Sequence, residues 1–130
     1  MKVIDGKGAT LGRIASLVAK EALKGEEISV INCDNVIITG NFSAIKENFE
    51  IKRGRVGSGQ KGPKHPATSE KIVKRAVRGM LPNHRAGRGK AALGRVKCYA
   101  KTPKEFENSK TEKIGLTKKI KFSEVKEFVK

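Results

Sequence analysis

Short apolar runs and one helical repeat make up the first part of the chain. Val3-Ile4 is the first run, and residues 28–33 form the second. Between the two runs, apolar residues recur at helical spacing: Leu11, Ile14, Ala15, Val18 and Ala22. Thr10 suits the N-cap of this helix and Gly25 its C-terminal end. Strand, helix and strand in this order predict a parallel pair with a right-handed crossover. Runs that are apolar throughout are typical of strands covered on both faces, so this part is predicted to be a small α/β sandwich.

The same two periods, of about 3.6 residues for a helix and 2 for a strand, predict the later elements. These are a strand at 36–38, a helix that Ser43 begins and that continues to about Ile51, a helix at 69–81 that Pro82 stops, a short helix at 91–93, a strand at 95–101 and a small helix that Ser123 caps.

Two stretches have no hydrophobic period. The first, residues 53–68, includes four glycines, two prolines and four basic residues between Arg53 and Pro66. The second, residues 83–90, is also rich in glycine and basic residues. Such composition cannot pack a core, so both stretches are expected to be surface loops. Long loops in compact domains are usually functional or disordered, which makes these two candidates for a binding surface.

The helix expected at 69–81 has two unlike faces. Its basic residues Lys71, Lys74, Arg75 and Arg78 follow the spacing i, i+3, i+4 and i+7, so they lie on one side. Its apolar residues centre on the opposite side. We therefore expect one face to be buried and the other to be cationic.

The net charge is concentrated in one part of the chain. Residues 51–101 carry 15 basic side chains and one acidic side chain, Glu70, a net charge of +14 out of +16 for all 130 residues. Residues 1–50 are almost neutral, with 6 basic and 7 acidic side chains. So large an excess opposes a compact state unless a polyanion neutralises it. Nucleic acid is the usual polyanion, and an acidic membrane surface is the competing one.

Length and composition bound the class of protein. A chain of 130 residues suits a single domain, here with a basic segment at 51–101 and a tail at 108–130. Cys33 and Cys98 are the only cysteines, too few for a disulfide framework. The first residues lack the apolar run of a signal peptide, and no stretch approaches the roughly 20 apolar residues of a membrane helix. A soluble cytoplasmic protein without membrane contact is expected.

A small nucleotide-binding enzyme is the least favoured of the three classes considered. Residues 6–12 form a glycine-rich turn between a strand and a helix, where a pyrophosphate could bind, and Asp34 could contact a ribose. The spacing is G-x-G-x-x-x-G, which differs from the dinucleotide fingerprint, and a tight turn explains it equally well. His65, His84 and the two cysteines lack metal-ligand spacing, so no metal or other cofactor is expected.

The basic segment favours RNA over DNA. The chain has no zinc-finger spacing and no basic region followed by heptads. Aromatic residues are 5% of the chain, which argues against a stacking platform for single strands. Recognition of folded RNA through its backbone and shape fits best, and a DNA-binding or transfer-RNA-binding regulator is the alternative.

With these residues identified, the chain resembles the large-ribosomal-subunit protein 13 family, in its archaeal and eukaryotic form, from about Val3 to Phe106. The resemblance rests on four ordered blocks, with two shorter stretches favouring that branch over the bacterial one. The blocks are Val3–Ser16, Val36–Asn41 followed by Lys46, Arg78–Pro82 and Ala91–Tyr99, and the shorter stretches are Gly62–His65 and Asn83–Arg85.

The resemblance implies a three-layer α/β/α domain with a short four-stranded parallel sheet, here with basic loops and a C-terminal helical tail. It also implies binding to large-subunit ribosomal RNA, contacts with neighbouring ribosomal proteins, and neither catalysis nor a small-molecule substrate. The RNA-binding residues expected from the residues and the resemblance together are Arg53, Arg55, Lys61, Lys64, His65, Lys71, Lys74, Arg75, Arg78, His84, Arg85, Arg88 and Lys90.

Overall fold

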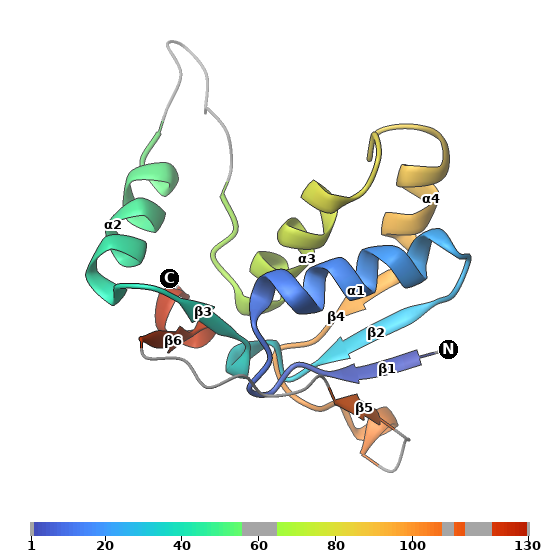
Figure 1. The fold of residues 1–130 in the computed structure, drawn as a ribbon, viewed down its shortest axis with the longest axis horizontal. Helices are drawn as coiled ribbons and strands as arrows, with labels where there is room; N and C mark the ends of the chain where they lie inside the picture. The colour runs from blue at the N-terminus through green and yellow to red at the C-terminus, as the bar shows by residue number, and fades with distance from the viewer. Residues whose placement is uncertain (1, 56–64, 108–110, 114–120, 130) are drawn as a thin grey trace.

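The computed structural model describes residues 2–55, 65–107, 111–113 and 121–129 (Figure 1). Its elements in chain order are β1 (Lys2–Asp5), α1 (Leu11–Leu23), β2 (Ile28–Ile31), the 3-10 helix η1 (Cys33–Asn35), β3 (Ile37–Thr39), α2 (Phe42–Arg53), α3 (Ser69–Met80), α4 (Gly87–Gly94), β4 (Val96–Cys98), the 3-10 helix η2 (Lys104–Phe106), β5 (Thr111–Lys113), β6 (Phe122–Glu124) and the 3-10 helix η3 (Val125–Phe128).

The larger sheet is parallel. Its strand order is β4-β2-β1-β5, and all three of its pairings are parallel. β1 and β2 pair from Lys2 opposite Ile28 to Asp5 opposite Ile31, and α1 is the crossover between them. The α/β class and the parallel sheet expected from the sequence are therefore confirmed.

The two faces of this sheet are covered differently. Ile4, Ile28, Val30 and Val96 belong to the main core, to which α1, α3 and α4 contribute from one face (Figure 1). Alternate positions point the other way, where Val3 and Ile31 pack with Tyr99 and Phe106. In the described part of the chain this second cover is the segment around η2 rather than an α-helix. That arrangement differs from the three layers that the family resemblance implies.

A second, antiparallel sheet of β3 and β6 lies beside the first. Ser123 is buried within β6, so it does not cap a helix as expected. Glu124 is the N-cap of η3 instead and exchanges hydrogen bonds with Glu127 in a capping box. The expected helical tail is thus a strand followed by one short 3-10 helix, whose Val125 reaches the main core.

Two element boundaries differ from expectation because of local hydrogen bonding and backbone conformation. Asn41, not Ser43, caps α2, since its side chain accepts a hydrogen bond from the Ser43 backbone N–H at 3.2 Å. β2 ends at Ile31 because Asn32 is left-handed, with φ of 56°. Cys33 therefore lies in η1 rather than in a strand.

The stretch 83–90, expected to be a loop, is helical from Gly87 onward. α3 ends at Met80, as Pro82 predicts, and the bend at residues 81–86 connects it to α4. Gly89 permits this tight connection: a methyl group there would lie 2.0 Å from the Pro82 carbonyl oxygen and 2.5 Å from that of Asn83. Arg88 and Lys90 consequently lie on a helix, not in a loop.

We expect Gly89→Ala to destabilise the protein by about 1–3 kcal/mol, because backbone atoms must shift to admit the methyl group. Gly79→Ala is the matched control within α3, since a methyl group there meets no atom within 4 Å. That substitution should be stabilising by about 0.5–1 kcal/mol. Urea unfolding followed by circular dichroism measures both changes, and equal free energies of unfolding for the two variants would contradict the role given to Gly89.

Candidate nucleic-acid interface

The structure separates the two faces of α3. Ile72, Val73 and Val77 are buried in the main core, where α3 packs against α1 and β4. The basic residues of α3 occupy the rest of its surface. Of these, Lys71 is exposed, whereas Lys74, Arg75 and Arg78 are partly covered. Long basic side chains commonly lay their carbon stems on apolar surface while the charged end stays in water. The two-faced helix expected from the sequence is confirmed.

A hollow of about 500 Å³ lies beside this basic face, and we call it the cationic hollow. Four cations line it together with one imidazole and three apolar residues. Its lining residues are His65, Pro66, Ala67, Lys71, Lys74, Arg75, Arg78 and Leu93. The hollow therefore joins the end of the first basic stretch to α3 and, through Leu93, to α4. A phosphate in it could accept charge-assisted hydrogen bonds from several directions.

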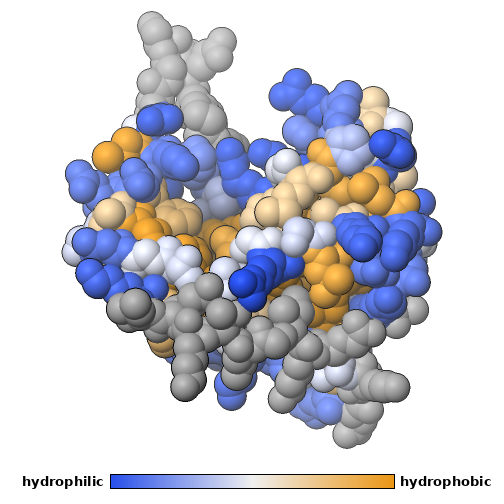
Figure 2. Space-filling view, viewed as in Figure 1, coloured by the Kyte–Doolittle hydropathy of each residue, from blue (hydrophilic) through white to orange (hydrophobic). Residues whose placement is uncertain are grey.

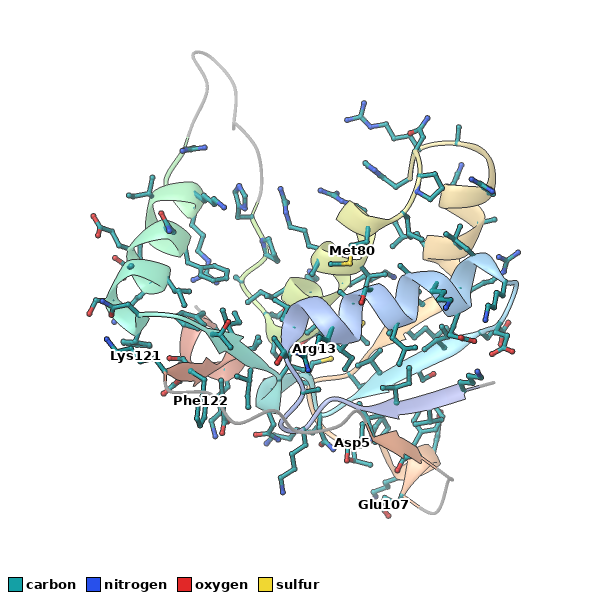
Figure 3. The ribbon with its side chains drawn as sticks, viewed as in Figure 1. Asp5, Arg13, Met80, Glu107, Lys121 and Phe122 are labelled. Atoms are coloured by element: carbon teal, nitrogen blue, oxygen red, sulfur yellow. The ribbon has the colours of Figure 1, made fainter. Side chains whose placement is uncertain are left out.

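A second basic group precedes and begins α4. Arg85, Arg88 and Lys90 are exposed, and His84 is half-buried. The Asn83 side chain accepts a hydrogen bond from the Arg85 backbone N–H at 3.1 Å, which shapes the turn. Figure 3 shows nitrogen-tipped side chains of this region pointing away from the sheet, and Figure 2 shows hydrophilic residues gathered there. This group lies close to the cationic hollow without lining it.

Arg53 makes several contacts within the chain. Its Nε and Nη2 donate to the Pro66 carbonyl oxygen at 3.4 and 3.1 Å, and Nη2 also donates to that of Phe128. Its guanidinium carbon lies 5.1 Å from the centre of the Phe49 ring. Arg53 thus ties the end of α2 to two other segments, which is a structural role that its position in a basic stretch did not indicate.

The remaining expected residues divide into two groups. Arg55 is exposed just beyond α2. Lys61 and Lys64 lie outside the described residues. A second hollow, between α2 and α3, is lined in part by Asn48 and Lys52 of α2, which were not predicted as site residues. Lys52 could have been found from the sequence, since it belongs to the basic segment, whereas nothing in the sequence pattern indicates Asn48.

The pKa of His65 lies below its ordinary value. Partial burial is the largest cause, and the positive charges of Arg75, Lys52, Arg55 and Arg53 add to it by opposing protonation. The unfolded chain therefore binds a proton at a higher pH than the folded protein does. The folded state loses stability as the pH falls from above the ordinary histidine pKa to below the folded one.

The turn at residues 6–12, considered above as a nucleotide site, is filled by the chain itself. The backbone N–H of Gly6 donates to the Ile31 carbonyl oxygen at 2.9 Å, and that of Gly8 donates to Asn35 at 3.1 Å. A methyl group at Gly6 would lie 2.7 Å from a Val36 methyl carbon. The Gly6 and Gly8 amides are occupied, so the turn packs against the end of β2 and the η1 segment rather than cradling a phosphate.

Cys33 and Cys98 behave as core residues. Cys33 is fully buried in the main core, and Cys98 packs against that core. A hydrogen bond with Cys98 and burial both raise the pKa of the Cys33 thiol, which keeps it protonated. Within the described ranges, histidine, cysteine and carboxylate side chains form no group of three that could hold a metal ion. None of the helices described here has the length and apolar character needed to cross a bilayer.

Comparison with known proteins gives one consistent result. A model of the family described as ribosomal protein L13 matches residues 1–105. The large ribosomal subunit protein uL13 of Thermoplasma acidophilum is 44% identical over 114 residues, which are 88% of this chain and 82% of that protein. The protein of the same name from Methanocaldococcus jannaschii is 39% identical over 130 residues, covering 96% of this chain and 94% of the relative.

We expect Arg75→Gln to raise the pKa of His65, because it removes the positive charge with the largest effect on that imidazole. Lys97→Gln is the control, since this exposed lysine of β4 is not among the charges that act on His65. An NMR titration of the His65 ring protons measures the change in each variant. An unchanged or lower pKa in Arg75→Gln would show that this charge does not act on His65.

Proposed function

Because the chain belongs to the ribosomal protein L13 family, we propose that it binds ribosomal RNA as a structural constituent of the large ribosomal subunit. The family is structural and not enzymatic. The observation that carries the RNA-binding proposal is the convergence of Lys71, Lys74, Arg75 and Arg78 on one hollow, on the side of α3 away from the core.

The proposed interface consists of the cationic hollow and the basic group at the start of α4. The hollow would hold phosphates of one backbone stretch, and the exposed side chains of α4 would contact the next. Rigid elements carry most of these cations, so their spacing is fixed before binding and suits a folded RNA of defined shape. The residues proposed to contact RNA are Arg55, Lys61, Lys64, His65, Lys71, Lys74, Arg75, Arg78, His84, Arg85, Arg88 and Lys90, with Arg53 holding α2 in place.

Several finer features belong to the same proposal. Residues 1–130 would form one domain with layers on both sides of its sheet. The protein would act within cytoplasmic ribosomes and contact neighbouring large-subunit proteins. The surface away from α3 and α4 supports such protein contacts, since Phe122 is 52% exposed on β6 (Figure 3). Exposed aromatic side chains are common anchors of protein interfaces.

We expect the double substitution Arg75→Gln and Arg78→Gln to weaken binding to large-subunit ribosomal RNA. It should also reduce the salt dependence of that binding, because two phosphate contacts are lost. Each lost contact should lower the slope of log affinity against log salt concentration by roughly 0.7–0.9. Filter binding at several salt concentrations measures both quantities.

The control is Lys20→Gln with Lys97→Gln, which removes the same charge from exposed positions on α1 and β4. Its slope should stay close to that of the unmodified protein. Equal slopes in the two double variants would mean that only total charge matters, and would contradict an interface at α3. Binding to DNA or transfer RNA with higher affinity than to ribosomal RNA would support the regulator considered from the sequence.

A further inference from the structure

A second hollow, of about 460 Å³, separates α2 from α3, and we call it the inter-helix hollow. Its walls are mainly apolar, and polar side chains lie among them. The lining residues are Leu11, Ile45, Asn48, Phe49, Lys52, His65, Pro66, Ile72, Arg75 and Ala76. In Figure 2 the surface is hollowed between the part that holds α2 and the part that holds α3.

The inter-helix hollow adjoins the cationic hollow. His65, Pro66 and Arg75 line both, so they form the rim between them. A chain of phosphates in the cationic hollow would therefore pass directly beside an apolar recess. One nucleotide of such a chain could keep its phosphate at this rim and place its base in the inter-helix hollow.

α2 is positioned in a way that keeps the inter-helix hollow open. None of its residues is buried, although Ile45 and Phe49 face the hollow. Its attachment lies on the side of η3, where the Phe49 and Phe128 rings stack with centres 5.1 Å apart and Arg53 donates to Phe128. α2 is thus held by η3 and, at its last residue, by Pro66 on the rim, while the apolar side chains of Ile45 and Phe49 still line the space between α2 and α3 among the described residues.

The polar groups of the inter-helix hollow suit a planar group with hydrogen-bonding edges. The Asn48 side chain makes no hydrogen bond within the described part of the chain, and its amide can both donate and accept. The lowered pKa of His65 favours its neutral ring, which can also both donate and accept. Lys52 and Arg75 add positive charge at the edge. An apolar side chain of a protein would use the walls but would leave these groups unpaired.

We propose that the inter-helix hollow binds one unpaired nucleotide of the RNA, with its base between α2 and α3 and its phosphate at the rim formed by His65 and Arg75. This inference rests on the proposed function and deepens it. The cationic hollow reads backbone charge and shape, whereas the inter-helix hollow adds a requirement for a nucleotide that is not base-paired. Unpaired bases are the usual targets where proteins recognise particular RNA positions.

Ala76→Leu tests this, because it fills the inter-helix hollow from α3 without altering any charge. Binding to large-subunit ribosomal RNA should weaken about tenfold, with the salt slope unchanged. At least one unpaired nucleotide protected by the unmodified protein should become reactive. The probes are dimethyl sulfate for adenine and cytosine and a water-soluble carbodiimide for uracil and guanine. Asn48→Ala should reduce the same protection while leaving the packing of α3 untouched.

Ala44→Leu is the matched control, since Ala44 is exposed on α2 and does not line the inter-helix hollow. It should bind and protect RNA like the unmodified protein, and circular dichroism should show all three variants folded. Unchanged affinity and protection in both Ala76→Leu and Asn48→Ala would overturn the inference. Release of a neighbouring protein from reconstituted subunits, with RNA protection intact, would overturn it in favour of a protein side chain. Failure of the unmodified protein to bind ribosomal RNA would instead overturn the proposed function.

Discussion

The packing of α3 against the rest of the core decides where the cationic surface lies. Ile72, Val73 and Val77 are buried against α1 and β4, and burial of three such side chains fixes the rotation of the helix about its axis. Lys71 and Arg78 can then only be on the outer side. A change that rotated α3 would move every charge of the cationic hollow at once. The apolar residues are therefore as important for the geometry of the interface as the charged ones.

The same arrangement carries an electrostatic cost in the absence of a polyanion. Four cations line one hollow, and one of them, Arg75, is among the positive charges that add to burial in lowering the pKa of His65. Within the α3 helix, Glu70 is the one acidic residue, and it lies in the first turn. Its negative charge there stabilises the helix by interacting with the positive end of the helix dipole. The Ser69 hydroxyl adds a second anchor there by donating to Asp34 of η1. The end of α3 nearest the sheet is thus stabilised locally, while its charged surface is left to be neutralised by a partner.

Much of the fold could be predicted from the sequence, because it depends on periodic burial. The apolar spacing of α1 and α3 and the continuous runs of β1 and β2 each identify one element and its buried side. The charge of residues 51–101 and the spacing of Lys71, Lys74 and Arg78 likewise predicted which side of α3 is cationic. These features are local in the chain, so a single sequence reveals them.

The features that escaped prediction depend on how one segment packs against another. Gly89 resembles a loop glycine until the carbonyl groups of Pro82 and Asn83 are placed against it. The structural contacts of Arg53 become visible only when Pro66 and Phe128 are found to accept its hydrogen bonds. The inter-helix hollow has the same origin, since its walls come from α1, α2 and α3. The hydrophobic period of one segment does not show which other segments pack beside it.

The support of α2 has a consequence for divergence within the family. The family model matches residues 1–105, which include α2, whereas Phe128 and the buried Val125 lie beyond it. A helix in the shared part is therefore positioned by a segment that the shared pattern does not specify. A different C-terminal segment in this chain would change the support of α2 and so open or narrow the inter-helix hollow. Residues at the end of the chain can thus alter the space beside α3 while every basic residue of α3 stays the same.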